Sequence, residues 1–397
     1  MNSVNFQSTY NELFAYCAAE NFAGYDPFDG LNSRIFQASP LKYSRLARLA
    51  FLQMVKRSAR NLRPALKIEK GVNAKGIALF ALAELSRFRA TYKPEHAENA
   101  KNLLKILFEQ KIPIQNPKSK IQNRTAFGYN FDWQSRVFFA PRGTPTIVPT
   151  AFAAQAFAES YRLFGEEEHR QIVLETARFV EGDLQRSVEN ETEICFSYTP
   201  LDSTKIYNAS LLAAEVLANA AEFNADKKYY ELAEKAARFA INQQQENGAW
   251  VYGTQNVQAW VDNFHTAYVL LSLFRLQKSI PGFRCDEAIQ KGLDYWLENF
   301  FLADGTPKYY DRETYPIDIH SASAAVVALC ELNERDARCL PLAEQVAGWT
   351  IRNMRDAAGY FYYQKRREKI VKTSFIRWSN AWTLFALARL IEAKSEK

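Results

Sequence analysis

The chain has 397 residues, of which 48% are hydrophobic, and a formal net charge of +6 from 50 Lys and Arg against 44 Asp and Glu. So modest a charge, spread along the chain, does not indicate nucleic-acid binding. No run of 18 apolar residues predicts a membrane span, and residues 1–22 lack the pattern of a secretory signal. The five cysteines form no CxxC pair, so we expect reduced thiols in a cytoplasmic protein.

A short sequence motif with a central alanine, which we call the phrase, recurs along most of the chain. Its alanines follow one another at intervals of 58, 58, 55 and 59 residues. Each phrase opens a nearly apolar helix, which is followed by a more polar helix and then by a loop rich in aromatic residues. A fixed period of this size predicts stacked helical hairpins. The five phrases are Thr150-Ala151-Phe152, Asn208-Ala209-Ser210, Thr266-Ala267-Tyr268, Ser321-Ala322-Ser323 and Asn380-Ala381-Trp382.

The hairpins predict an all-α fold, an (α/α)6 toroid. Helices apolar on nearly all sides, and therefore expected to be buried, are predicted over 74–90, 149–164, 207–223, 263–278, 320–333 and 379–393. Amphipathic outer helices are predicted over 95–110, 167–186, 227–245, 284–300 and 336–355, with a helix near 42–60 as the sixth. We expect one domain over 1–397, with 1–41 as an N-terminal extension. An open solenoid is the alternative, but solenoids show more uniform repeats and polar end caps.

The connections between helices are unequal. Turns from inner to outer helices are short and polar, whereas loops from outer to inner helices are long and aromatic. The longest insertion spans roughly 112–147. In a toroid the long loops gather around the N-termini of the inner helices, and long loops on a rigid scaffold commonly carry function. We therefore expect the functional site at this mouth.

Two of the four histidines are candidates for acid–base catalysis. His265 and His320 stand at the starts of successive predicted inner helices, on what should be a solvated rim of the mouth. Histidine is suited to proton transfer near neutral pH. The alternative is that each only hydrogen-bonds a neighbouring loop. His96 and His169 fall among Glu and Lys at outer-helix starts and are expected on the solvated surface.

Carboxylates also collect at the predicted mouth. Asp132, inside the long insertion, is a candidate catalyst with no evident capping role. Asp262 is a candidate catalyst or hydroxyl binder, and Asp318 a candidate substrate-binding residue. Both stand where a helix N-cap would, so capping alone could explain them.

The remaining candidates would bind a sugar. Arg136 and Arg377, together with six inner-helix N-termini, favour an anionic ligand such as a uronate or a sugar phosphate. Aromatic rings with interleaved polar groups suit sugar rings, although they would also suit a prenyl chain. No GxxxxGK[ST], GxGxxG or HExxH motif and no metal-ligand spacing occurs, so neither a metal nor a cofactor is expected. The further candidate binding residues are Tyr129, Trp133, Asn208, Trp260, Tyr310 and Trp378.

Three segments carry a family resemblance. Gly24-Tyr25-Asp26-Pro27-Phe28-Asp29-Gly30-Leu31-Asn32-Ser33 resembles the N-terminal motif of VpsJ-like polysaccharide biosynthesis proteins of exopolysaccharide and O-antigen gene clusters. Asp132-Trp133-Gln134-Ser135-Arg136 and Trp260-Val261-Asp262-Asn263-Phe264-His265-Thr266 resemble the same group. The resemblance implies a toroid related to prenyltransferase and squalene-cyclase repeats and to six-hairpin glycan enzymes, without implying a settled reaction.

A more distant likeness is to the N-acylglucosamine 2-epimerase family. That likeness implies a pair of inner-helix histidines as acid and base, roles that His265 and His320 would fill. A cyclase is less favoured, because no Asp-rich DxDD motif occurs.

The sequence thus predicts a glycan-active protein of bacterial surface-polysaccharide biosynthesis. The expected chemistry is proton transfer at a sugar carbon, as in an epimerase or lyase, or glycoside hydrolysis. Two alternatives stay open: a non-catalytic glycan-binding or assembly module, and a prenyltransferase-like or terpenoid-cyclase-like enzyme.

Overall fold

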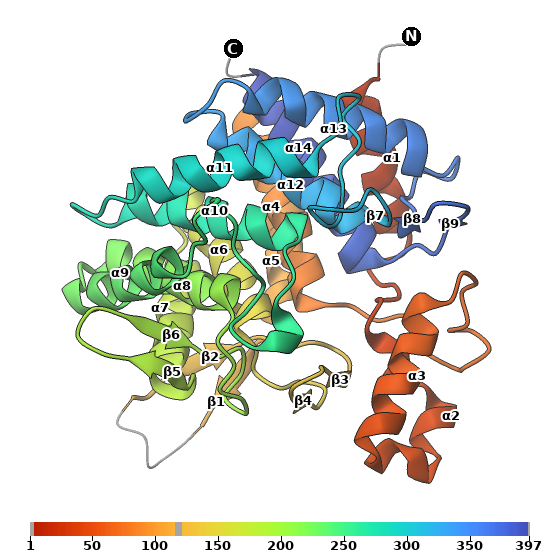
Figure 1. Cartoon of the computed structure of the whole chain (residues 1–397), viewed down its shortest axis with the longest axis horizontal. Helices are drawn as coiled ribbons and strands as arrows, with labels where there is room; N and C mark the ends of the chain where they lie inside the picture. Colours follow the sequence, from red (N-terminus) through yellow and green to blue (C-terminus); the bar gives the residue numbers. More distant parts are fainter. Residues whose placement is uncertain (1–3, 116–120, 396–397) are drawn as a thin grey trace.

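The computed structural model describes residues 4–115 and 121–395, so residues 116–120 of the predicted insertion lie outside it. Within the described chain six helices form an inner ring, in which each packs on the next and the last packs on the first (Figure 1). The predicted (α/α)6 toroid is confirmed. The inner helices are α4 (Ala74–Thr91), α6 (Ile147–Phe164), α8 (Tyr207–Asn224), α10 (Asn263–Ser279), α12 (Ile319–Leu332) and α14 (Trp382–Ser395), the last preceded by the π-helical segment η4 (Ile376–Ala381).

Each inner helix packs against an outer helix. For the first five, the partner is the next helix in the chain: α5 (Pro94–Phe108), α7 (Glu167–Asp183), α9 (Lys227–Asn242), α11 (Asp286–Phe300) and α13 (Cys339–Met354). The inner-to-outer turns are tight, and the turn after α6 uses Gly165 in the left-handed region, at φ 70°. The last inner helix, α14, packs instead against α1 (Phe6–Ala19) from the other end of the chain.

The prediction that a helix near 42–60 is the sixth outer helix is therefore wrong. That segment forms α3 (Arg45–Arg57), which packs against η1 (Asp29–Asn32), η2 (Pro40–Tyr43) and the insertion rather than against an inner helix. The physical difference lies in the apolar stripe. Helix α1 buries Tyr10, Leu13 and Cys17, whereas α3 exposes Leu46 and Met54 to solvent.

The recurring phrase has a structural explanation. At three inner-helix starts its polar side chain accepts a hydrogen bond from the backbone N–H of a buried phenylalanine in the preceding loop. These bonds join Phe127 to Thr150 (2.9 Å), Phe196 to Ser210 (3.1 Å) and Phe361 to Asn380 (3.0 Å). The small central alanine lets neighbouring helices approach. The phrase thus anchors three of the aromatic loops on the ring.

The otherwise helical fold also contains short antiparallel strands, which lie mostly within the long loops. One hairpin pairs β1 (Ile112–Ile114) with β2 (Arg124–Ala126), another β3 (Trp133–Gln134) with β4 (Phe139–Ala140), and a third β5 (Arg186–Glu189) with β6 (Ile194–Phe196). A three-stranded sheet joins β7 (Ile317–Asp318), β8 (Gln364–Lys365) and β9 (Ile370–Val371). A single turn, η3 (Asn256–Gln258), lies in the loop before α10.

Residues 34–57, which comprise α2 (Arg34–Gln37), η2 and α3, form a projection that we call the arm (Figure 1). The arm has a small core of its own, in which the rings of Phe36 and Phe51 stack 4.4 Å apart near Leu52. It is tied to the insertion, where Arg48 donates to Gln134 (2.8 Å). The arm is therefore a lobe with its own core, attached to the insertion.

Ion pairs link every neighbouring pair of inner helices near their C-terminal ends. Most of these side chains are largely shielded from solvent, and two glutamates each serve two arginines. The ring is closed at this end by Arg89–Glu159, Arg162–Glu222, Arg275–Glu215, Arg275–Glu331, Arg389–Glu331 and Arg89–Glu392. A further pair, Arg389–Glu392, lies within α14.

Replacing Glu331 should destabilise the ring. Burial alone would raise the pKa of Glu331, but the guanidiniums of Arg275 and Arg389 outweigh burial and lower it to about 2. Glu331→Gln removes a carboxylate that Arg275 and Arg389 share, but each arginine keeps one other glutamate. We therefore expect a loss of about 1–3 kcal/mol in the free energy of unfolding. Urea or thermal unfolding measures it.

The matched control is Glu334→Gln, because Glu334 forms an exposed pair with Lys278. It should cost less than about 1 kcal/mol. The dependence of stability on acidic pH provides a second test of this role. Since the folded pKa lies below the usual value, the stabilisation by Glu331 is present above the unfolded pKa and should fade as the pH falls toward about 2. Equal losses for the two variants would contradict this role.

Candidate functional site

A cavity of about 320 Å³ lies at the N-terminal end of the inner ring. All six inner helices contribute to it, as expected if they run parallel. In each, the second residue after the N-cap lines the cavity, which gives one layer of six side chains. These are Lys75, Val148, Asn208, Phe264, His320 and Arg377.

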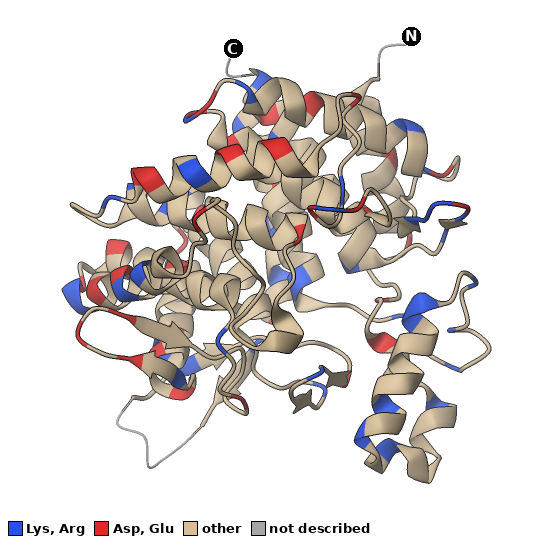
Figure 2. Ribbon diagram, in the orientation of Figure 1, with Lys and Arg blue, Asp and Glu red and all other residues tan. Residues whose placement is uncertain are grey.

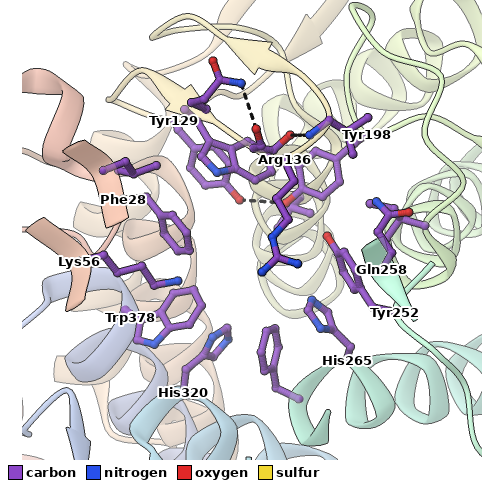
Figure 3. A pocket seen from close by; sticks show the side chains of 18 of the residues that line it. Phe28, Lys56, Tyr129, Arg136, Tyr198, Tyr252, Gln258, His265, His320 and Trp378 are labelled. Atoms are coloured by element: carbon purple, nitrogen blue, oxygen red, sulfur yellow. Dashed lines mark hydrogen bonds between the residues drawn. The ribbon is translucent and has the colours of Figure 1, made fainter. Parts of the chain in front are cut away.

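Aromatic side chains from the loops and from residues 24–33 build the walls above this layer. Figure 3 shows Phe28, Lys56 and Trp378 along one wall and Tyr252, Gln258 and His265 along the other, with Arg136 reaching between them. The Tyr252 and Trp260 rings stack 4.7 Å apart, and the Arg136 guanidinium lies 5.7 Å from the Trp260 ring. Of the predicted binding residues, the cavity is lined by Tyr129, Trp133, Arg136, Asn208, Trp260, Tyr310, Arg377 and Trp378.

His265 is held in one orientation by a buried aspartate. Asp262 caps α10 by accepting the backbone N–H of His265 (3.0 Å), and its other oxygen accepts the Trp260 indole N–H (2.8 Å). That second oxygen also lies 2.7 Å from Nδ1 of His265. Because the carboxylate is an acceptor in these contacts, Nδ1 carries the proton and Nε2 is the nitrogen left for a ligand. The His265 side chain remains 18% exposed.

His320 differs from His265 in its surroundings. It is 1% exposed and packs against Trp378 (4.2 Å between centroids), not on the solvated rim expected from the sequence. Burial, with Lys75 and Arg377 nearby, holds its pKa well below the usual range, so the ring is neutral. Its Nε2 lies 2.8 Å from the Tyr268 hydroxyl. Both histidines contact the Phe264 ring, at 3.9 and 4.5 Å between centroids, so they share one site.

A buried lysine completes this group. Lys75 donates to the Tyr268 hydroxyl (3.2 Å), and its amine lies 4.3 Å from the centroid of the Phe152 ring. Burial and the nearby charge of Arg377 hold its pKa well below the usual range. Burial raises the pKa of Tyr268, which remains a neutral phenol. Lys75, Tyr268 and His320 therefore form a continuous polar chain along the cavity floor.

The cavity is rich in cations. Lys56 and Arg136 enter it from the arm and the insertion, and Lys75 and Arg377 from the ring. Arg377 is 3% exposed and forms a two-point pair with Asp26, at 2.6 and 2.8 Å. This pair uses Nε and one terminal nitrogen, which leaves the other terminal nitrogen for a ligand.

None of the predicted carboxylates lines the cavity within the described chain. Asp132 was expected at the cavity, and this placement is wrong: its oxygens accept the Arg142 backbone N–H (2.7 Å) and the Gln37 amide (3.2 Å), which fixes the insertion to the arm. Asp262 and Asp318 both cap helices, as the alternative interpretation had it. Asp318 accepts the His320 backbone N–H (2.9 Å) and the Trp378 indole (2.8 Å), and burial raises its pKa to about 6.

The two other histidines are not on the solvated surface, so that expectation is also wrong. His96 is 7% exposed and lies 2.8 Å from Glu84, and His169 is 6% exposed and lies 3.0 Å from the Ser160 hydroxyl. Each occupies a polar niche between an inner helix and its outer partner.

Several cavity residues escaped the sequence analysis, among them Phe28, Lys56, Lys75, Tyr198, Tyr252 and Tyr268. A signal existed for Lys75, since a lysine in a nearly apolar helix, two residues after the cap Asn73, is unusual. Tyr268 lies inside a recurring phrase and resembles core. The described residues contain no cluster of His, Cys, Asp and Glu able to hold a metal, and none of the described helices is long and apolar enough to cross a membrane.

No protein-family model and no curated protein matches the sequence. Among solved structures, the chain is similar to a cellobiose 2-epimerase from Bacillus thermoamylovorans, with a TM-score of 0.63 and 13% identity over 98% of each chain. A GH76 α-mannanase from Bacteroides thetaiotaomicron has a TM-score of 0.61 and 10% identity, over 83% of this chain and 88% of that one. A D-mannose isomerase has a TM-score of 0.57 and 14% identity, over 82% of this chain and 88% of that one. At such identities the likeness shows the fold alone.

The cations predict a pH dependence of anion binding. Burial lowers the pKa of Lys56 to about 8, against the opposing pull of Asp318 and Asp26. Since Lys56 attracts an anion only when protonated, the affinity for glucuronate should fall as the pH rises through about 8. Calorimetric titration of the wild type and Lys56→Met between about pH 7 and about pH 9 measures this.

Lys56→Met should bind glucuronate more weakly at neutral pH and lose the pH step. Lys369→Met, which removes a lysine from the β8–β9 loop outside the cavity, is the control and should retain the step. A step of the same size in Lys56→Met would show that another group causes it.

Proposed function

We propose that this chain is an enzyme that moves a proton at a carbon of an anionic sugar, with His265 as the acid–base group. The observation that carries the proposal is the His265–Asp262 contact, which presents Nε2 to a cavity lined by aromatic rings and cations. Solved structures with this fold include a sugar epimerase, a sugar isomerase and a mannanase, which supports a sugar ligand. The cavity volume is at the low end for small-molecule sites and suits one or two sugar units.

The cationic side chains in the cavity favour proton abstraction next to a sugar carboxylate. A C–H bond next to a sugar carboxylate becomes acidic enough to break only when the charge developing on that carboxylate is stabilised. Lys56, Arg136 and Arg377 would supply this stabilisation while His265 Nε2 takes the proton. Return of a proton to the opposite face gives an epimer, whereas loss of the neighbouring substituent gives an unsaturated sugar. Tyr268, backed by His320, is the candidate donor for the second face.

Unpaired polar groups support a hydroxyl-rich ligand. Asn208 is 4% exposed, lines the cavity, and has an Oδ1 atom without a partner among the described residues. A buried acceptor of this kind costs about 1–3 kcal/mol unless it is satisfied, and a sugar hydroxyl would satisfy it. Aromatic faces such as Trp260 and Tyr310 would cover the C–H side of the ring.

Other reactions are less favoured by the same geometry. Glycoside hydrolysis generally uses two carboxylates at the scissile bond, and Asp132, Asp262 and Asp318 all lie outside the cavity lining. A prenyl chain would leave the cations and Asn208 without partners along its length. A role in surface-polysaccharide synthesis, and thus a cytoplasmic location, rests on the resemblance of residues 24–33 to the VpsJ-like group.

Replacing His265 tests the proposal. His265→Gln should lower the rate of deuterium incorporation from D₂O into a uronic acid or its oligomer by about 10²–10⁴-fold, the usual loss when general acid–base catalysis is removed. Mass spectrometry of the recovered sugar measures incorporation, and ultraviolet absorbance detects an unsaturated product.

His169→Gln is the matched control, because it changes a histidine outside the cavity and should exchange deuterium at the wild-type rate per folded molecule. Full activity in His265→Gln would remove His265 from the mechanism. Wild-type protein that binds the sugar without exchange or elimination would establish a glycan-binding module instead of an enzyme.

A further inference from the structure

The arm concentrates exposed apolar side chains. Of the large hydrophobic residues that the described chain exposes, five lie between residues 35 and 54, and the other four are scattered over the surface. Tyr43 is 79% and Leu46 77% exposed, far more than packing against the ring would leave. The arm residues are Ile35, Leu41, Tyr43, Leu46 and Met54, and the scattered ones are Tyr92, Leu201, Val257 and Leu302.

The arm and the residues that flank it are strongly basic. Between Gly30 and Ile68 the sequence contains nine Lys and Arg and no Asp or Glu, a local excess larger than the net charge of +6 of the whole chain. Figure 2 shows blue segments along the helices of the arm. The described ion pairs neutralise Arg34 with Glu69 and Arg63 with Asp29, and both partners lie outside this segment. The arm therefore presents a positive field to its surroundings.

The apolar residues of α3 form a stripe. Leu46, Ala50 and Met54 follow one another at four-residue spacing and are all exposed, so they share one face of the helix. Leu41 and Tyr43 precede α3 in η2, and Arg45 and Arg57 flank the stripe at its two ends. An exposed apolar stripe on a basic helix is the arrangement of helices that lie in the headgroup region of a membrane.

We propose that the arm docks on an anionic lipid surface, with Leu41, Tyr43, Leu46 and Met54 inserted at headgroup level. Charge complementarity favours lipid over a second copy of the chain, because two arms would bring together surfaces of the same sign. The small core around Phe36 and Phe51 keeps the arm folded when its outer face inserts.

Docking would also orient the cavity. A neighbouring face of α3 lines the cavity through Leu49, Gln53 and Lys56, so the helix that touches the membrane is itself a wall of the site. The cavity of the docked protein would open close to the headgroups, whichever ligand it takes.

Vesicle flotation tests the proposal with the full-length protein. Wild type should float with vesicles containing about a third phosphatidylglycerol in phosphatidylcholine, bind pure phosphatidylcholine at least about tenfold more weakly, and dissociate at high salt. Leu41→Ser/Tyr43→Ser/Leu46→Ser should bind at least about tenfold more weakly than wild type. Lys42→Gln/Arg60→Gln should reduce binding to anionic vesicles and leave the residual binding to neutral ones unchanged.

The matched control removes three exposed apolar side chains elsewhere, as Tyr92→Ser/Leu201→Ser/Leu302→Ser, and should float like wild type. Hydrogen exchange gives an independent readout, since residues 40–54 should gain protection when anionic vesicles are added. Wild-type protein that does not float, or arm and control variants that float equally, would overturn the proposal. So would a dimer in light scattering that only the arm variant abolishes, because the stripe would then bind a second copy.

Discussion

The cavity depends on one buried ion pair, between Asp26 and Arg377. The two residues are 351 positions apart, and each is at most 4% exposed. A buried charge that loses its partner typically costs 3–5 kcal/mol, so Arg377 can stand at the start of the last inner helix only because Asp26 is there. The pair fixes residues 24–33 as a strap across the join between α14 and α4. Phe28, from the same strap, then meets Trp378 in the cavity wall at 5.5 Å between centroids.

The two ends of the inner ring use charge in opposite ways. At the C-terminal ends, arginines and glutamates alternate from helix to helix, and their charges largely cancel within the protein. At the N-terminal ends Asp262 and Asp318 cap helices and Asp26 pairs with Arg377, while Lys56, Lys75 and Arg136 line the cavity. Helix N-termini add to this positive potential. The charges at the C-terminal end of the ring are thus nearly balanced, whereas the N-terminal end has an excess of positive charge around the cavity. A bound anion would balance this excess.

The inner helices were predictable because a helix buried on every side is apolar on every side, a property that needs no knowledge of its neighbours. The residue of each inner helix that lines the cavity could not be predicted in the same way. The cavity layer is counted from the N-caps, and the recurring phrases stand at varying distances from these caps, so Lys75 and Arg377 do not align in the sequence repeat. Asp132 was misplaced because its partner Gln37 is 95 residues away, and long-range contacts leave no periodic signal. The choice between α1 and α3 as the sixth outer helix likewise depended on which face each helix buries.

The central claim is that the cavity holds an anionic sugar with its acid group on the cations and a C–H bond facing His265. The most direct measurement is a crystal structure of the inactive His265→Gln variant with a bound uronic acid. The account predicts the carboxylate within hydrogen-bond distance of Lys56, Arg136 or Arg377, and the adjacent carbon next to residue 265. A sugar bound outside the cavity, or one with its carboxylate turned to bulk solvent away from these cations, would contradict it.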